Sequence, residues 1–269
     1  MPSARDLAAA AERSDDLLAG ATERFSGYAL MSLPFSSGYV LGLRRFPVTS
    51  IGPGYTSVWL RRPSGAWSIY PSIDPSLSCP RYFGGALEST SVHPVTVDWT
   101  GDLDFSVRID DDVRLRWDVT LVDTGMTRMM SGMAGAMPEA FWRSDAFLTA
   151  LGAVAGPSLR AGRIGMRGRT PNRQVFKANV SHMWVVERSS ATLGGEDLGV
   201  MEPLPEQTRL GEFWMPQRGD LHDRRARVRS PGCRGASADH YGRRPLMRAL
   251  RRLFDLIRQD PRKTGGSDL

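Results

Sequence analysis

Alternation of hydrophobic and polar residues is the strongest pattern in the first half of the chain. It is clearest over residues 113–121, where Val113, Leu115, Trp117, Val119 and Leu121 share one face. Successive side chains of a strand point to opposite faces, so this segment is predicted to be a strand with one buried side and one solvent-facing side. Burial on one side only is typical of antiparallel sheets.

Two hairpins are predicted before this strand. Residues 55–60 and 66–70 flank an Arg-Pro-Ser-Gly turn, and residues 95–99 and 103–109 flank a Thr-Gly-Asp turn. β-Rich runs on either side of such turn signals favour hairpins. Further strands are expected at residues 39–46, 163–169, 174–178 and 182–187.

Helical spacing occurs at the N-terminus. Ser3 and Asp6 have the spacing of a capping box, and apolar residues then recur at helical steps as far as Leu18. We expect a helix over residues 4–19, within an N-terminal arm that comprises residues 1–26.

A second helical segment interrupts the strands. Five methionines follow one helical stripe, and Pro138 can begin a further helix; the methionines are Met126, Met129, Met130, Met133 and Met137. These residues predict a helical insert over 126–157.

These patterns predict a mainly β domain over residues 27–217. We expect an antiparallel lipocalin- or calycin-like barrel, or a curved sandwich, with the insert covering one end. Closing a sheet removes its exposed edges, and about eight strands leave room for one small ligand.

Charge divides the chain at about residue 217. Residues 218–269 carry 14 basic and 6 acidic side chains, a net charge of +8, whereas residues 1–217 carry 21 basic and 23 acidic ones, a net charge of −2. The basicity therefore gives no support to nucleic-acid binding by the globular part.

Three interpretations of residues 218–269 stay open. The segment is a disordered arginine-rich extension, or a frame-shifted end, or it contains a basic amphipathic helix over residues 245–258. Such a helix would bind an anionic membrane or an acidic partner. The frame-shift interpretation rests on residues 227–235, which in a neighbouring frame resemble the end of a strand and a turn.

Few residues offer covalent or metal chemistry. Cys79 and Cys233 lie far apart, which favours a reducing compartment, and neither a signal peptide nor a spanning segment is evident, so a cytoplasmic location is expected. The four histidines are isolated in the sequence. No metal and no cofactor is therefore predicted.

The remaining candidates are catalytic or ligand-binding. His93 or Asp98 could transfer a proton as an acid or a base. Ligand contacts are expected from six residues. Arg81 and Tyr82 would orient the polar head of a ligand, Trp99 and Trp117 would line an apolar cavity, and the pliable side chains of Met130 and Met133 would cover it. For each of these six, packing within the fold is the competing interpretation.

The hairpin over Tyr55–Tyr70 and the segment Val97–Leu103 carry a resemblance to a family. Their turn and tryptophan pattern resembles the lipocalin-like barrel of the carotenoid 1,2-hydratase (hydroxyneurosporene synthase) and AttH-type group, and the span 27–217 also resembles actinobacterial proteins. The resemblance implies a cavity for an apolar molecule and no cofactor. No catalytic residue of the group matches a position in this chain.

Three functions follow as hypotheses. The leading one is binding of a small hydrophobic molecule in a barrel cavity, with a possible cofactor-free isomerase or cyclase activity. The alternatives are an interaction protein that uses its basic C-terminal segment on membrane or nucleic acid, and a hydratase-like acid–base enzyme. The sequence does not decide whether the chain is an enzyme.

Overall fold

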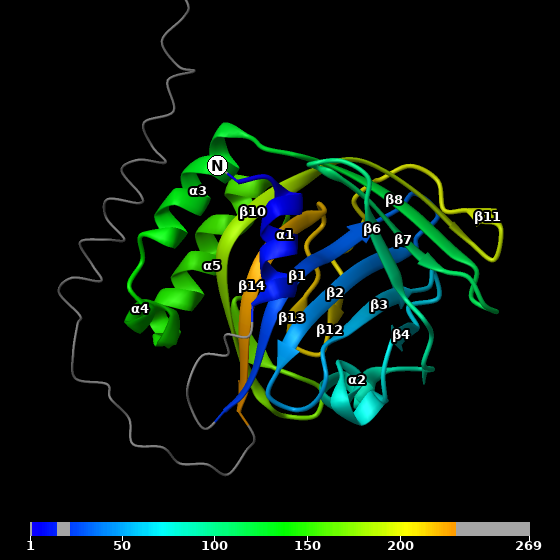
Figure 1. Cartoon of the computed structure of the whole chain (residues 1–269), viewed down its shortest axis with the longest axis horizontal. Coiled ribbons are helices and arrows are strands. Elements are labelled where there is room, and N and C mark those ends of the chain that lie inside the picture. The colour runs from blue at the N-terminus through cyan, green and yellow to red at the C-terminus, as the bar shows by residue number, and fades with distance from the viewer. Residues whose placement is uncertain (1, 15–21, 230–269) are drawn as a thin grey trace, which may run out of the picture. The chain divides into compact units, whose positions relative to one another are not determined.

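A computed structural model describes residues 2–14 and 22–229 of the chain. The α-helices are α1 (Ala4–Arg13), α2 (Pro80–Phe83), α3 (Gly125–Gly135), α4 (Glu139–Arg143) and α5 (Asp145–Leu159). The strands are β1 (Glu23–Pro34), β2 (Val40–Thr49), β3 (Tyr55–Arg61), β4 (Trp67–Pro71), β5 (Ser89–Thr90), β6 (Thr96–Trp99), β7 (Asp104–Ile109), β8 (Leu115–Val122), β9 (Arg167–Arg169), β10 (Val175–Leu193), β11 (Glu196–Asp197), β12 (Arg209–Leu210), β13 (Phe213–Trp214) and β14 (Asp220–Arg229). The described chain is mainly β, as predicted (Figure 1).

One large sheet organises the fold. Its strand order is β5-β4-β3-β2-β1-β14-β10-β8-β7-β6, and the small strands β9 and β11 also pair with β10. All neighbours are antiparallel except β4 and β5, which are parallel. Within the described residues the strand order ends at β5 on one side and at β6 on the other. The sheet is therefore open, and the strand order does not form the closed barrel that the sequence predicted.

Both predicted hairpins are confirmed. β3 pairs with β4, with Trp59 opposite Ile69, and β6 pairs with β7, with Val97 opposite Val107. The predicted alternation over β8 is also confirmed, because Leu115, Trp117, Val119 and Leu121 are buried while Arg114, Arg116 and Asp118 are exposed. The strands predicted at residues 174–178 and 182–187 are parts of one strand, β10.

The sheet does not end where the sequence predicted. β14 begins at Asp220, beyond the boundary expected at residue 217, and lies between β1 and β10. Leu221, Ala226 and Val228 of this strand are buried, and these apolar positions in the arginine-rich stretch allow it to enter the sheet. The predicted helix over residues 245–258 lies outside the described residues, as do residues 230–235 of the frame-shift hypothesis.

The helices begin where capping residues occur. Ser3 and Asp6 form the predicted capping box of α1, which ends at Arg13 rather than near residue 19. The N-terminal arm is shorter than expected, because β1 already begins at Glu23. The insert consists of α3, α4 and α5, and α3 packs on β10 (Figure 1). None of the described helices is long and apolar enough to cross a membrane.

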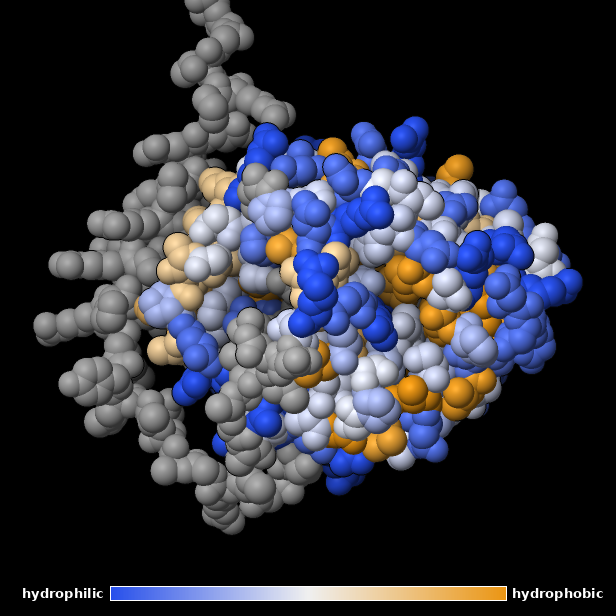
Figure 2. Space-filling model, viewed as in Figure 1, coloured by the Kyte–Doolittle hydropathy of each residue, from blue (hydrophilic) through white to orange (hydrophobic). Residues whose placement is uncertain are grey.

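The main core lies between the two halves of the curved sheet. Its buried side chains come mostly from α1 and from β1–β4, β7, β8, β10 and β14, and include Leu30, Leu43, Val58, Val107 and Trp117, each fully buried. A second cluster, which includes Trp59, Tyr82 and Phe213, packs α2 and the β12–β13 hairpin against the other face of β1–β4. Exposed apolar surface is scattered: hydrophobic residues form small groups among hydrophilic ones on the face drawn in Figure 2.

Candidate functional site

His93 is the one predicted catalytic residue that the fold surrounds with chemical partners. It lies in the segment between β5 and β6, where its backbone N–H donates to the carbonyl of Pro71 at the end of β4. Its side chain is only 7% exposed and packs against the ring of Tyr70. The buried position fixes the orientation of the imidazole.

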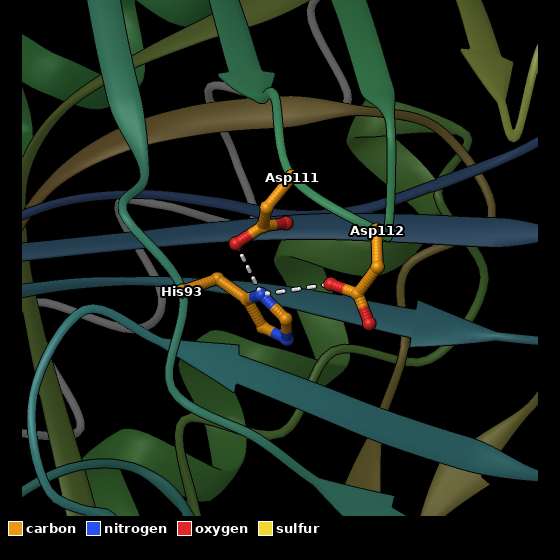
Figure 3. Close-up of side chains that lie close together, drawn as sticks. All are labelled: His93, Asp111 and Asp112. Carbon is orange, nitrogen blue, oxygen red and sulfur yellow. Dashed lines mark hydrogen bonds and ion pairs between the residues drawn. The ribbon is translucent and has the colours of Figure 1, made fainter.

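Both ring nitrogens of His93 have hydrogen-bonding partners. Nδ1 lies 2.7 Å from Oδ2 of Asp111, and Nε2 lies 2.6 Å from the hydroxyl of Ser91. The two aspartates Asp111 and Asp112 belong to the turn between β7 and β8, and Oδ1 of Asp112 is 3.6 Å from Nδ1 (Figure 3). Residues 18 positions apart therefore meet at one imidazole.

The protonation pattern of this group follows from the charge on Asp111. The hydrogen bond with His93 is the largest cause that lowers the pKa of Asp111, so the carboxylate is ionised and only accepts hydrogen bonds. Nδ1 of His93 must then carry the proton. In the neutral ring Nε2 is left as an acceptor, and the hydroxyl of Ser91 donates to it.

The turn that carries Asp111 is itself fixed. Oδ1 of Asp111 accepts a hydrogen bond from the backbone N–H of Val113, and the carbonyl of Asp111 accepts one from Arg114. Arg114 has a φ of 46°, in the left-handed region that closes tight turns. Asp111 is thereby held in place by the β7–β8 turn.

Ser91 and His93 differ in their exposure to solvent. Ser91 is exposed to solvent, whereas the His93 side chain is almost completely covered. A serine that bonds a buried, oriented imidazole and belongs to an exposed segment can meet a substrate. This is the arrangement of nucleophile, base and orienting carboxylate used in acyl transfer.

A metal ion is the other group that such residues could hold. Atoms of His93, Asp111 and Asp112 lie within 4.8 Å of one another, which makes them the one cluster of three such ligands among the residues described. The sequence prediction of no metal site missed this cluster. However, two ligand atoms of a tetrahedral Zn²⁺ lie roughly 3.3 Å apart at ordinary bond lengths. The distance of 2.7 Å between Nδ1 of His93 and Oδ2 of Asp111 is shorter and is that of a direct hydrogen bond.

Asp98, the other predicted catalytic residue, does not join this group. Its carboxylate on β6 pairs with the guanidinium of Arg108 on β7, and both side chains are more than 40% exposed. An exposed ion pair between neighbouring strands has a structural role of modest energy. Among the described residues the bonded partner of Asp98 is Arg108, which stays protonated and so gives Asp98 no partner for proton transfer.

The six predicted ligand-binding residues lie in three separate packing clusters. Arg81 and Tyr82 of α2 both bond the carboxylate of Glu23, at 2.8 and 2.7 Å. Arg81 is exposed and Tyr82 is buried, so the pair fixes α2 to β1. The polar ligand head that Arg81 and Tyr82 were expected to orient is replaced by this carboxylate of the chain itself.

The tryptophans and methionines belong to the packed interior. Trp117 is fully buried in the main core and donates its Nε1–H to the hydroxyl of Ser189, and Trp99 packs on Phe105 in the same core. Met130 and Met133 pack between α3 and β10. The structure does not bring these four residues together with Arg81 and Tyr82 around one hollow.

Sequence reasoning found His93 but missed Ser91 and Asp111. Ser91 and His93 lie two positions apart, which is visible in the sequence. That spacing alone does not show that the serine hydroxyl bonds the imidazole. Asp110, Asp111 and Asp112 are typical turn residues that precede the strand predicted at residues 113–121, and nothing in their sequence position indicates which histidine they face.

Comparison with known proteins gives weak structural alignments and no sequence match. No family model matches the sequence, and no curated protein matches it. Two solved structures align at low similarity. One is described as structural studies of acetoacetate decarboxylase, with 8% identity, a TM-score of 0.37, and coverage of 78% of this chain and 88% of the other. The second is acetoacetate decarboxylase from Legionella pneumophila, with 9% identity, a TM-score of 0.33, and coverage of 81% and 89%. Neither is a carotenoid hydratase, and the resemblance to that family stays a prediction.

Proposed function

We propose that the protein is a serine hydrolase that cleaves carboxylic esters, with Ser91 as the nucleophile and His93 as the general base. The observation that carries the proposal is the continuous hydrogen-bonded chain from Ser91 through His93 to Asp111, with distances of 2.6 and 2.7 Å. Asp111 is a positioning residue in this scheme, because it acts through the imidazole.

The chemistry follows the order of the hydrogen bonds. As Oγ of Ser91 attacks the ester carbonyl carbon, Nε2 of His93 takes the hydroxyl proton, and Asp111 stabilises the imidazolium that forms. The tetrahedral intermediate collapses when the C–O bond to the alcohol breaks, and His93 returns the proton to that leaving alcohol. Water then attacks the acyl-serine with His93 again as the base, which releases the acid and restores Ser91.

The surroundings of Ser91 favour some esters over others. Asp111 and Asp112 lie beside the imidazole, and Val92, next to Ser91, is one of the exposed large hydrophobic residues of the described chain, at 51%. Carboxylates near the site repel an anionic substrate. The substrate class is therefore an uncharged or cationic ester with an apolar group.

The direct test is ester hydrolysis by the full chain. Purified protein is assayed with p-nitrophenyl acetate and with the anionic p-nitrophenyl succinate, beside the variants Ser91→Ala and Ser64→Ala. Ser64 is an exposed serine of the β3–β4 turn and serves as the matched control. Loss of the nucleophile should lower kcat/KM at least about 10²-fold, and the neutral ester should be preferred. Equal rates for Ser91→Ala and Ser64→Ala would refute the proposal.

A further inference from the structure

A second site is suggested by an arginine-lined pocket on another part of the fold. The pocket has a volume of about 530 Å³ and is lined by Arg169, Thr170, Arg173, Arg209, Gly211 and Glu212. Small-molecule sites have volumes of roughly 300–1,000 Å³. The lining contains three cations and one carboxylate, so an anion would be attracted to it.

The three arginines of the pocket differ from many others in the described chain. Ion pairs to carboxylates engage Arg45, Arg62, Arg81, Arg108, Arg116, Arg128, Arg143, Arg167 and Arg227. In the same described residues, no ion pair forms at Arg169, Arg173 or Arg209. The guanidinium of Arg209 lies over the ring of Trp214 and pairs with no carboxylate of the described residues.

The single acid in the lining does not neutralise these charges. Oε2 of Glu212 accepts a hydrogen bond of 2.8 Å from the backbone N–H of Arg169. That carboxylate thus joins the β12–β13 turn to β9. Its bond goes to a backbone amide, and the guanidinium groups remain available for a ligand.

Two tight turns build the walls of the pocket and hold its shape. Arg173 has a φ of 67° in the turn between β9 and β10, and Gly211 has a φ of 65° in the turn between β12 and β13. The turns touch, because a Cβ at Gly211 would lie 3.1 Å from the ring of Pro171. Within the first turn, Thr170 is buried; its backbone N–H donates to the carbonyl of Gln174, and its hydroxyl accepts a hydrogen bond from the N–H of Gln174.

The turn that carries Arg173 is also fixed from outside. Its Asn172 donates from Nδ2 to the carbonyl of Arg81 at 2.7 Å and accepts at Oδ1 from the N–H of Gly85. These bonds fasten the turn to α2 and the residues that follow it. Because the backbone positions are fixed before a ligand arrives, less ordering is needed when one binds.

We infer that this pocket, here called the arginine pocket, binds a small molecule through a phosphate monoester or equivalent doubly charged oxyanion. The planar guanidinium group can donate two parallel hydrogen bonds to such an anion. Three cations and one carboxylate give the lining a net charge of +2, which suits a dianion better than a singly charged carboxylate. The pocket is an open depression of the surface, which can take the charged group of one small molecule, whereas a polyanion such as nucleic acid is bound along an extended basic surface.

The test is isothermal titration of the full chain with inorganic phosphate, at a constant ionic strength set by chloride. The variants are Arg173→Asn with Arg209→Gln, and Arg188→Gln as the control. Asparagine tolerates the positive φ at position 173. Arg188 is an exposed arginine without an ion pair in the described chain, at the other end of β10.

Saturable phosphate binding should weaken at least tenfold in the double variant and change less than twofold in Arg188→Gln. Residues 230–269 are the same in all three proteins, so phosphate held by them does not affect the difference. Thermal melts establish that each variant is folded; if the double variant is not, Arg169→Gln alone replaces it, with a loss of at least threefold expected. Equal affinities in the wild type and the folded pocket variant would overturn the inference.

Discussion

Asp111 accepts a hydrogen bond from Nδ1 of His93 at 2.7 Å, although the two residues are 18 positions apart. The bond joins the turn between β7 and β8 to the segment that follows β5, and it sets which nitrogen of the ring is protonated. Nε2 is thereby turned into an acceptor for the hydroxyl of Ser91. The activity that we propose depends on this orientation.

Replacing Asp111 by Asn tests whether the carboxylate of Asp111 orients the imidazole of His93. Asparagine keeps the size of the side chain but can present an amide donor to Nδ1, which disfavours the protonated-Nδ1 tautomer. We expect kcat for ester hydrolysis to fall about 10²- to 10⁴-fold. Asp112→Asn is the matched control, because Asp112 lies 3.6 Å from the same nitrogen. Similar rates for the two variants would show that Asp111 does not orient the ring.

The position of β14 predicts that two truncated chains will differ in whether they fold cooperatively. A chain that ends after Gln217 lacks the strand between β1 and β10 and leaves both without a partner at the middle of the sheet. A chain that ends after Pro231 keeps the whole compact unit. We expect cooperative urea unfolding, followed by near-UV circular dichroism, only for the longer chain. A cooperative transition in the shorter chain would contradict the place of β14 in the fold.

Trp117 tests whether the interior is packed. It is fully buried in the main core, and its Nε1–H is bonded to Ser189. Trp117→Ala should lower the free energy of unfolding by about 3–5 kcal/mol, because it leaves a cavity and removes the hydrogen bond that the hydroxyl of Ser189 accepts. Val92→Ala, at an exposed position, should change it by about 0.5 kcal/mol or less. A small effect at Trp117 would mean that the side chain lines an existing hollow, as the sequence had suggested.

Tyr28 predicts how stability depends on alkaline pH. Burial raises the pKa of Tyr28 to about 12, from an ordinary value of 10.0. Between these values the unfolded chain has lost the proton and the folded protein has kept it, so stability is fully present below pH 10 and is lost as the pH rises toward 12. The loss between pH 9 and pH 11 is roughly 1.3 kcal/mol.

The check is urea unfolding at those two pH values for wild type and Tyr28→Phe. The variant cannot ionise at this position and should lose less stability, while other buried tyrosines contribute equally to both proteins. An identical loss in the two proteins would show that Tyr28 ionises as readily in the folded state as in the unfolded chain.

Local patterns in the sequence predicted most of the strands. The hairpins and β8 follow from side-chain alternation and turn residues, which are properties of a few neighbouring positions. β14 could not be found in this way, because its arginines resemble a solvated tail and its burial depends on β1 and β10, which lie far away in the sequence. Composition therefore placed the domain boundary too early.

The candidate site shows the same limit. His93 was found as an isolated histidine, but its contact with Asp111 depends on how the fold places the end of β4 beside the turn between β7 and β8. The six expected ligand-binding residues were chosen because their side chains can bond or pack against a ligand. In the fold these side chains bond or pack against other residues of the same chain. Glu23 satisfies Arg81 and Tyr82, and Ser189 satisfies Trp117.

Removal of divalent ions offers a separate check of the site. In the proposed mechanism His93 and Asp111 bond each other and no metal takes part, so EDTA should leave ester hydrolysis unchanged within about twofold. Added Zn²⁺ would compete for Nδ1 and the carboxylates and should inhibit. Loss of activity in EDTA that Zn²⁺ restores would instead assign His93, Asp111 and Asp112 to a metal site.

The most direct measurement is covalent labelling of the full chain with a fluorophosphonate, followed by mass spectrometry of the peptides. This reagent reacts with a serine whose hydroxyl is activated by a neighbouring base. We predict one adduct at Ser91, formed at a rate that falls at least about tenfold in the His93→Gln variant. An unlabelled Ser91 in the folded wild-type protein, or labelling that is independent of His93, would contradict the assignment of Ser91 as the nucleophile.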